Sequence, residues 1–187
     1  MDNIEITKKS QTENPGFIHV YTGNGKGKTT AALGLALRAA GRKKQVYIAQ
    51  FLKKMPYGEL DSIHLHLKEF ITIEQFGLPE FHHTGSQVTT EERNAAMQGI
   101  HAVQKAMDSN TYDIIILDEI NVLAYFKIVE LEILLDLIDK KPYPMELILT
   151  GRNAPQEFIE RAQLVTEMKE IKHYYTHGIQ ARDGIER

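Results

Sequence analysis

The chain has 187 residues, which is enough for one domain with a substantial core, and its 42% hydrophobic and 25% charged residues are those of an ordinary globular protein. A formal charge of −3 argues against a nucleic-acid partner held by bulk electrostatics, and the absence of cysteine excludes disulfides and thiolate metal sites. No apolar run approaches the roughly 20 residues of a membrane span and residues 1–14 do not form a secretory signal, so we expect no membrane partner and a cytoplasmic location.

The N-terminal part of the chain predicts an arm followed by a phosphate-binding loop. Residues 1–15 are polar and end at Pro15-Gly16, which favours a flexible arm, and residues 16–187 are expected to form a single domain. From Phe17 to Thr30 the chain predicts a strand, a glycine-rich loop and the start of a helix. This order of strand, loop and helix is the context that a phosphate-binding loop requires.

The loop itself contains the residue types that phosphate binding needs. Three glycines lack a Cβ, so that the backbone can take positive φ and direct its N–H groups at phosphate oxygens: Gly23, Gly25 and Gly27. The helix that follows adds the partial positive charge of its N-terminus. Lys28 is expected to reach across a triphosphate, and the hydroxyl of Thr29 is expected to ligate Mg²⁺.

One position departs from the strict phosphate-loop pattern. That pattern has glycine at position 22, where this chain has Thr22, so the turn must begin one residue later. The rival dinucleotide-binding pattern is excluded, because it would need glycine in place of Lys28.

Apolar patterning predicts the remaining elements. We expect helices over 29–40, 58–68, 90–108, 131–138 and 156–162, and strands over 46–51, 71–76, 113–119, 145–149 and 164–168. The first helix is expected to end at Gly41 in a left-handed conformation, and the third to begin with an N-cap near Thr90. The connection over 77–89 is long for a compact domain, which is typical of functional loops. Arg38 on the first helix is either a solvated cation or a group that reaches back along the triphosphate.

A second chemical landmark lies at Asp113 to Glu119. Four consecutive apolar residues predict a central parallel strand that is buried on both faces, and two carboxylates follow at its C-terminal end, Asp118 and Glu119. Open α/β sheets bind ligands at this end, and phosphate-loop proteins place a magnesium-binding acid there. The two side chains are expected to point in opposite directions, one toward the metal and one toward a loop.

The eight histidines do not predict a metal site. His173 and His177 are four residues apart but lack the glutamate of the His-Glu-x-x-His pattern, and the pair His82-His83 has no nearby pair of carboxylates. His64 and His66 would diverge on a helix. We therefore expect surface or packing roles for them.

Several blocks together resemble the ATP:corrinoid adenosyltransferases of the phosphate-loop type. The blocks are Thr22-Gly23-Asn24-Gly25-Lys26-Gly27-Lys28-Thr29-Thr30 and residues 50–53, 117–119, 146–155, 164–168, 172–173, 178–179 and 184–186, and they span the chain in order from residue 16. The blocks Thr-Gly-Arg-Asn-Ala-Pro and Val-Thr-Glu-Met are not general nucleotide-binding motifs. Thr22 is itself the form found in this family.

The resemblance implies a reaction and a site. ATP would donate its 5′-deoxyadenosyl group to Co(I) of a corrinoid, in adenosylcobalamin synthesis or salvage, and release triphosphate from an orientation that is reversed relative to phosphate-loop hydrolases. Carried over by position, the phosphates would be held by Asn24, Gly25, Lys26, Gly27, Lys28, Thr29 and Thr30. Thr29 and Glu119 would support Mg²⁺ or Mn²⁺, and Arg38 and Arg182 would contact the triphosphate. An electron donor such as a flavoprotein and a homodimer are also implied.

The corrinoid side of the site follows the family less closely. The chain has no tryptophan, and Phe81-His82-His83 stands where a Phe-x-Trp pair is often found in the family. Phe76 and Phe81 could supply an apolar wall that displaces the lower ligand of cobalt, although a histidine could instead ligate cobalt. For Phe76, plain core packing is the alternative.

The expected fold is a three-layer α/β domain of the phosphate-loop NTPase type with a mostly parallel sheet. A phosphotransferase or ATP hydrolase would use the same loop and acid, and is kept as the alternative function. A non-catalytic nucleotide switch is the third hypothesis.

Overall fold

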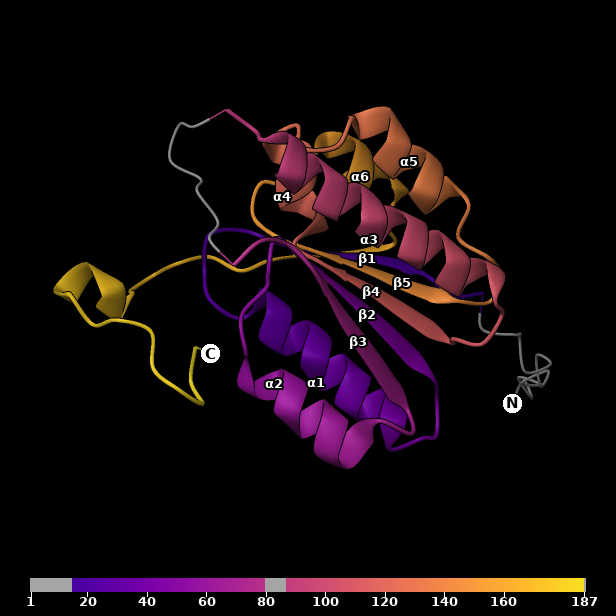
Figure 1. Ribbon diagram of the computed structural model, residues 1–187, viewed down its shortest axis with the longest axis horizontal. Helices are drawn as coiled ribbons and strands as arrows, with labels where there is room; N and C mark the ends of the chain where they lie inside the picture. The colour runs from indigo at the N-terminus through magenta and orange to yellow at the C-terminus, as the bar shows by residue number, and fades with distance from the viewer. Residues whose placement is uncertain (1–14, 80–86, 187) are drawn as a thin grey trace, which may run out of the picture.

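The protein, described here from a computed structural model over residues 15–79 and 87–186, is built on a six-stranded sheet (Figure 1). The strands in chain order are β1 (Ile18–Thr22), β2 (Val46–Phe51), β3 (Ile71–Phe76), β4 (Ile114–Asp118), β5 (Glu146–Thr150) and β6 (Leu164–Glu167). They lie side by side in the order β3-β2-β4-β5-β1-β6, and every pair is parallel. All six C-terminal ends therefore meet at one edge.

Helices cover both faces of this sheet. One face carries α1 (Lys28–Ala40), α2 (Gly58–Ser62) and the π-helical turn η1 (Ile63–Leu67). The other carries α3 (Thr90–Asp108), α4 (Ile120–Tyr125), α5 (Leu131–Asp139) and α6 (Gln156–Arg161), which lie above the sheet in Figure 1. The predicted three-layer α/β fold is thus confirmed.

The central strands explain why the sheet is covered twice. Every residue of β2 and β4 is buried, as the apolar run over 114–117 predicted. Because side chains alternate along a strand, Ile115 and Leu117 pack toward the core under α3 to α6, whereas Ile114 and Ile116 join the core under α1. A strand with two apolar faces needs a covering layer on each side, and here both layers are helices.

Local details differ from the expected ones at several boundaries. Helix α1 ends before Gly41, but Gly41 is right-handed with φ −61°, and the left-handed residue of the turn is Lys43 with φ 60°. This correction has a simple cause, since the N–H groups of residues 41–43 still bond to carbonyls of the last helical turn. The N-cap of α3 is Thr89, one residue earlier than expected, and it forms a capping box with Glu92.

Some helical elements differ from the predicted ones. The expected helix over 58–68 divides into α2 and η1, and two short elements, α4 and the 3₁₀ turn η2 (Tyr174–His177), were not predicted.

After β6 the chain extends away from the sheet and then returns toward the loop that follows β1 (Figure 1). Across the described ranges, no helix combines the length and the apolar character needed to cross a bilayer. Residues 1–14, which include nearly all of the predicted arm, lie outside the description.

Candidate phosphate- and metal-binding site

The loop over 23–27 joins β1 to α1 and is braced by the end of β6. Gly23 and Gly27 have φ of 92° and 122°, as a phosphate-binding loop requires. Gly25 does not have a left-handed φ, which corrects the expectation for that residue. It must be glycine for another reason: its N–H donates to the carbonyl oxygen of Met168 at 2.7 Å, and a Cβ would lie 2.8 Å from that oxygen.

The start of α1 offers free donors at the end of this loop. Gly27 is its N-cap, no side chain caps the helix, and its first turn contains no acidic residue. The N–H groups of that turn therefore have no side-chain acceptor, and together with the helix dipole they make a place for an anion.

Lys28 is folded back over the loop. Its Nζ donates to the carbonyl oxygens of Gly23 and Gly25, both at 2.8 Å, and only 7% of the residue is exposed. Burial lowers the pKa of Lys28, and the carboxylate of Glu119 partly offsets this effect. The ammonium thus lies in the concave side of the loop, on acceptors that a phosphate could replace.

Asp118 is the centre of a buried polar network. It is 1% exposed and sits at the end of β4. Its Oδ1 accepts hydrogen bonds from the hydroxyls of Thr29 at 2.9 Å and Thr150 at 2.6 Å, and its Oδ2 forms a 2.6 Å ion pair with Lys53. Burial, the largest single influence, lowers the pKa of Lys53, but the charge and hydrogen bond of Asp118 together with the charges of Glu119 and Glu59 outweigh it, so that the pKa is raised.

Glu119 leaves the strand in a different direction. Its backbone is left-handed with φ 67°, its N–H donates to the Thr150 hydroxyl at 3.1 Å, and its side chain lines the cavity in front of the loop. Burial raises the pKa of Glu119, and the negative charge of Asp118 raises it further. The predicted divergence of the two acids is therefore present: Asp118 faces the polar network and Glu119 faces the cavity.

The donor set fits a hard cation that is only partly held by protein. Thr29, Asp118 and Glu119 offer oxygen atoms, which Mg²⁺ and Mn²⁺ prefer. No group of three or more acidic, histidine or cysteine side chains able to hold a metal exists among the described residues. Magnesium sites of this kind are completed by phosphates and water rather than by a protein cage.

The turn after β5 brings a guanidinium to the same cavity. Asn121 donates from Nδ2 to the carbonyl oxygen of Gly151 at 2.9 Å, and the N–H of Ala154 donates to the Thr22 hydroxyl at 3.2 Å. Arg152 stands between these two anchors and lines the cavity. Within the described ranges it has no hydrogen-bond or ion-pair partner, so it presents an unpaired cation from a well-held turn.

The cavity has a volume of about 610 Å³ and is closed on one side by the C-terminal segment. Its walls come from the phosphate loop, the start of α1, the segment from Lys53 to Glu59, Glu119, Arg152 and the tail residues His173 and 184–186. Lys26 fixes the tail by donating to the carbonyl oxygen of Ile185 at 3.0 Å and by pairing with Glu186 at 3.7 Å.

The structure brings together some of the predicted site residues and separates others. Gly25, Lys26, Gly27, Lys28, Thr29, Thr30 and Glu119 line the cavity, whereas Gly23 and Asn24 belong to the loop but not to the wall. Arg182 is held by Glu186 and lies over the ring of Tyr174, its Cζ 4.9 Å from the centroid. It is near the cavity wall without being part of it.

Two predicted residues lie elsewhere. Arg38 is exposed in the last turn of α1, ten residues or roughly 15 Å beyond Lys28. Phe76 packs against the core beside Phe51, with ring centroids 6.1 Å apart, as core packing requires. Phe81 lies outside the described residues, as does the pair His82-His83.

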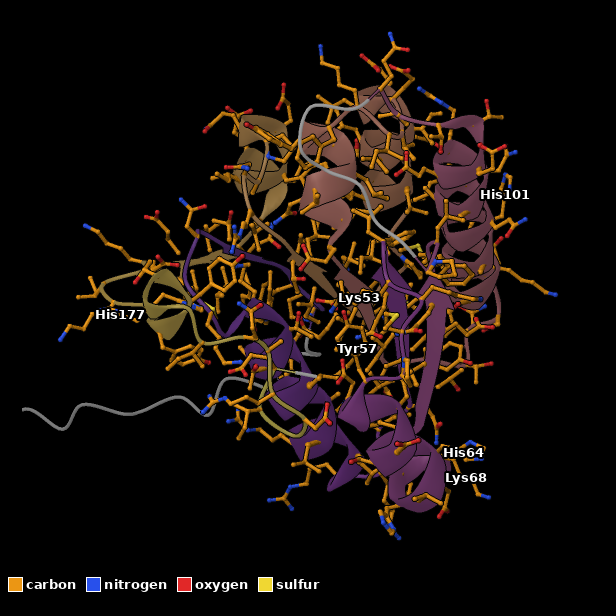
Figure 2. All side chains as sticks on the ribbon, turned by 60° about the vertical axis from the view of Figure 1, so that its left-hand side comes forward. Lys53, Tyr57, His64, Lys68, His101 and His177 are labelled. Carbon is orange, nitrogen blue, oxygen red and sulfur yellow. The ribbon has the colours of Figure 1, made fainter. Side chains whose placement is uncertain are left out.

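Three histidines of the described residues lie far from one another. His64, His101 and His177 lie on η1, α3 and η2, well apart on the exterior of the molecule (Figure 2). This arrangement agrees with the expectation of surface roles for them.

Sequence reasoning missed three members of the site. It assigned no role to Lys53, Thr150 or Arg152. Two signals were present: all three lie in the blocks 50–53 and 146–155 that resemble the family, and they stand at or just after the ends of β2 and β5, on the edge of the sheet where ligands bind.

Comparisons with known proteins give a consistent picture. The model of the family described as ATP:corrinoid adenosyltransferase BtuR/CobO/CobP matches residues 14–187. A corrinoid adenosyltransferase of Escherichia coli K12 is 34% identical over 99% of this chain and 92% of its own, and the corrinoid adenosyltransferase CobA of Salmonella typhimurium LT2 is 31% identical over the same shares. Among solved structures, a KaiC-like protein from Pyrococcus horikoshii OT3 has a TM-score of 0.56 at 17% identity, covering 84% of this chain and 75% of its own, which shows likeness of fold alone.

Proposed function

Because the chain belongs to the ATP:corrinoid adenosyltransferase family BtuR/CobO/CobP, we propose that it transfers the 5′-deoxyadenosyl group of ATP to Co(I) of a corrinoid, with release of triphosphate. The observation that carries this proposal is the family match over residues 14–187. The matched range includes the phosphate loop, the acids after β4, the turn that carries Arg152 and the C-terminal segment, which together form one cavity.

The phosphate loop supplies the ATP-binding part of the proposal. The backbone of residues 23–27 and the first turn of α1 offer N–H donors to the phosphates. Lys28 exchanges its two carbonyl acceptors for phosphate oxygens, which are better acceptors because they are charged. Lys26 and Thr30 line the same cavity, and Asn24, on the loop behind the wall, is proposed to support the phosphates as well.

Thr29 and Glu119 are proposed to hold Mg²⁺ or Mn²⁺, with Asp118 orienting the Thr29 hydroxyl. Such a cation would neutralise charge on the leaving triphosphate. Arg152 is placed to contact the same phosphates, because it lines the cavity and its guanidinium has no hydrogen-bond or ion-pair partner among residues 15–79 and 87–186. Arg38 and Arg182 remain predictions, and each would need a movement of chain or partner to reach a bound triphosphate.

The proposed reaction depends more on the alignment of cobalt with C5′ than on acid–base catalysis. Co(I) donates an electron pair to C5′, the bond between C5′ and its oxygen breaks, and triphosphate leaves with that bonding pair. The protein therefore has to hold the phosphates with C5′ exposed to cobalt and stabilise the leaving charge. The cations Lys26, Lys28, Lys53 and Arg152 around one cavity are suited to the second task.

The remaining parts of the proposal concern the acceptor and the cell. Phe76 and Phe81 are proposed to contribute to an apolar wall for the corrinoid, although Phe76 already packs against the core. An electron donor such as a flavoprotein would supply Co(I). A homodimer, a cytoplasmic location and one domain over residues 16–187 are also proposed.

The alternative is a phosphotransferase or an ATP hydrolase. It is favoured by one observation: Glu119 lines the cavity beside the phosphate loop and has a raised pKa, as a residue that orients water would. The two functions differ in their products, because hydrolysis or phosphoryl transfer leaves ADP, and adenosyl transfer leaves triphosphate.

Product analysis tests the proposal directly. The protein is incubated with ATP, Mg²⁺ and chemically reduced cobalamin, and the formation of a carbon–cobalt bond is followed by absorbance while ion chromatography separates triphosphate from ADP and phosphate. We expect adenosylcobalamin and triphosphate in equal amounts, with both reduced at least about a hundredfold by Lys28→Ala and unchanged by Lys54→Ala on the neighbouring exposed lysine. ADP as the main product would refute the proposal and support the alternative.

A further inference from the structure

Lys53, which follows the central strand β2, is unusually well buried for a lysine in a loop. Its Nζ lies 2.6 Å from Oδ2 of Asp118 and 3.5 Å from Oγ1 of Thr29. The side chains of Lys53 and Asp118 are only 15% and 1% exposed. An ammonium therefore stands beside the Thr29 hydroxyl, one of the two proposed metal ligands, and beside the carboxylate that orients it.

The backbone fixes this placement. Leu52 has a left-handed φ of 58°, and its N–H donates to the carbonyl oxygen of Phe76 at 2.9 Å. Gly77 packs so closely against this segment that a Cβ on it would lie 2.4 Å from the backbone nitrogen of Lys53. The ends of the adjacent strands β2 and β3 thus fix the backbone of Lys53, so that its side chain reaches the network around Asp118.

The ammonium that pairs with Asp118 also lies over an aromatic ring. Nζ of Lys53 is 5.4 Å from the ring centroid of Tyr57, and Figure 2 shows both residues together in the middle of the molecule. Tyr57 and Glu59 also line the cavity. The contact with the Tyr57 ring therefore remains available to the cation if its ion pair with Asp118 opens.

We propose that Lys53 is a resident cation at the contact between Asp118 and Thr29: it neutralises Asp118 beside the Thr29 hydroxyl when no divalent cation is bound, and its ion pair with Asp118 opens when Mg²⁺ arrives at Thr29 with nucleotide phosphates. The proposal rests on the nucleotide and metal part of the proposed function and is independent of the corrinoid. It has a direct consequence: free divalent cations bind poorly, because they must displace a lysine without the phosphates that would complete their coordination.

The test uses Mn²⁺ alone, followed by electron paramagnetic resonance, on the full chain without nucleotide or corrinoid. We expect wild type and the control Lys54→Met to bind Mn²⁺ weakly, and Lys53→Met to bind it about tenfold or more tightly, because the competing charge is gone. Equal Mn²⁺ affinity in Lys53→Met and in wild type would overturn the proposal.

A second variant separates the mechanism from a folding defect. Lys53→Met leaves Asp118 as a buried unpaired charge, whereas Lys53→Met combined with Asp118→Asn removes both charges and keeps the network neutral. We expect the double variant to fold and to lose the gain in Mn²⁺ affinity; retention of that gain would refute the role of Asp118. Since these titrations contain no ATP or corrinoid, a failed product analysis would refute the proposed function without affecting their result.

Discussion

Thr150 allows a quantitative test of how the two acids are held. Its hydroxyl is fully buried, donates to Oδ1 of Asp118 at 2.6 Å and accepts from the N–H of Glu119 at 3.1 Å. Thr150→Val keeps the volume and the β-branched shape, so no cavity forms. It removes a hydrogen bond to a charged group, worth about 1.5–3 kcal/mol, and takes the acceptor from the half-buried N–H of Glu119, which costs about 1 kcal/mol.

We therefore expect Thr150→Val to lower the free energy of unfolding by about 3 kcal/mol, measured by urea denaturation followed by far-ultraviolet circular dichroism. The matched control is Thr166→Val on the exposed edge strand β6, where the change should stay within about 0.5 kcal/mol. A loss below about 1 kcal/mol for Thr150→Val would refute the inference that this hydroxyl holds the network together.

Three further changes test other parts of the structure. Gly99→Ala places a Cβ 2.5 Å from Cε1 of Phe51 and 2.8 Å from Cγ of Phe76, so overpacking should destabilise the protein by about 1–2 kcal/mol in urea, and a stabilising effect would contradict the packed position of Phe76. Burial, followed by the charge of Asp118, raises the pKa of Glu119, so the stability that this carboxyl contributes is present at low pH and is lost as the pH rises through its folded-state pKa. The melting temperature of Glu119→Gln should therefore rise relative to that of wild type as the pH goes from about 4 to about 8. A difference in melting temperature that does not change with pH would refute the argument. Arg152→Lys should weaken ATP binding by about tenfold in isothermal titration, because an ammonium cannot replace a bidentate guanidinium, and unchanged affinity would exclude contact of Arg152 with the phosphates.

Contiguous features were predictable because their meaning is local. The order of strand, glycine loop and lysine identifies a phosphate loop within 14 residues, since the backbone and one side chain form most of the contact surface. The run of apolar residues before Asp118 predicted a central parallel strand, and the structure places β4 between β2 and β5. The predicted helix over 90–108 has the bounds of α3.

Two arginines show that distance along the chain does not give distance in space. Arg38, whose contact with the triphosphate the family resemblance implies and which stays a prediction, lies ten residues of helix beyond Lys28, in the last turn of α1. Arg152 lies more than a hundred residues from the loop, yet β5 is the direct neighbour of β1, so its turn opens beside the loop. Distance along the chain and distance in space have opposite order for these two residues.

The glycines of the phosphate loop also show that a residue type can be required by a contact between distant segments. The sequence explained all three by backbone conformation, but Gly25 is required because β6 approaches it, and only the pairing of β6 with β1 creates that contact.

By itself, the sequence determined the phosphate loop, the buried strand with its two acids and the alternation of strands and helices, because each of these depends on residues that are neighbours along the chain. Only the tertiary structure decided which side chains meet at the C-terminal edge of the sheet. Asp118, Thr29, Thr150 and Lys53 come from four different segments, and they contact one another because parallel pairing in the order β2-β4-β5-β1 brings the ends of those strands together.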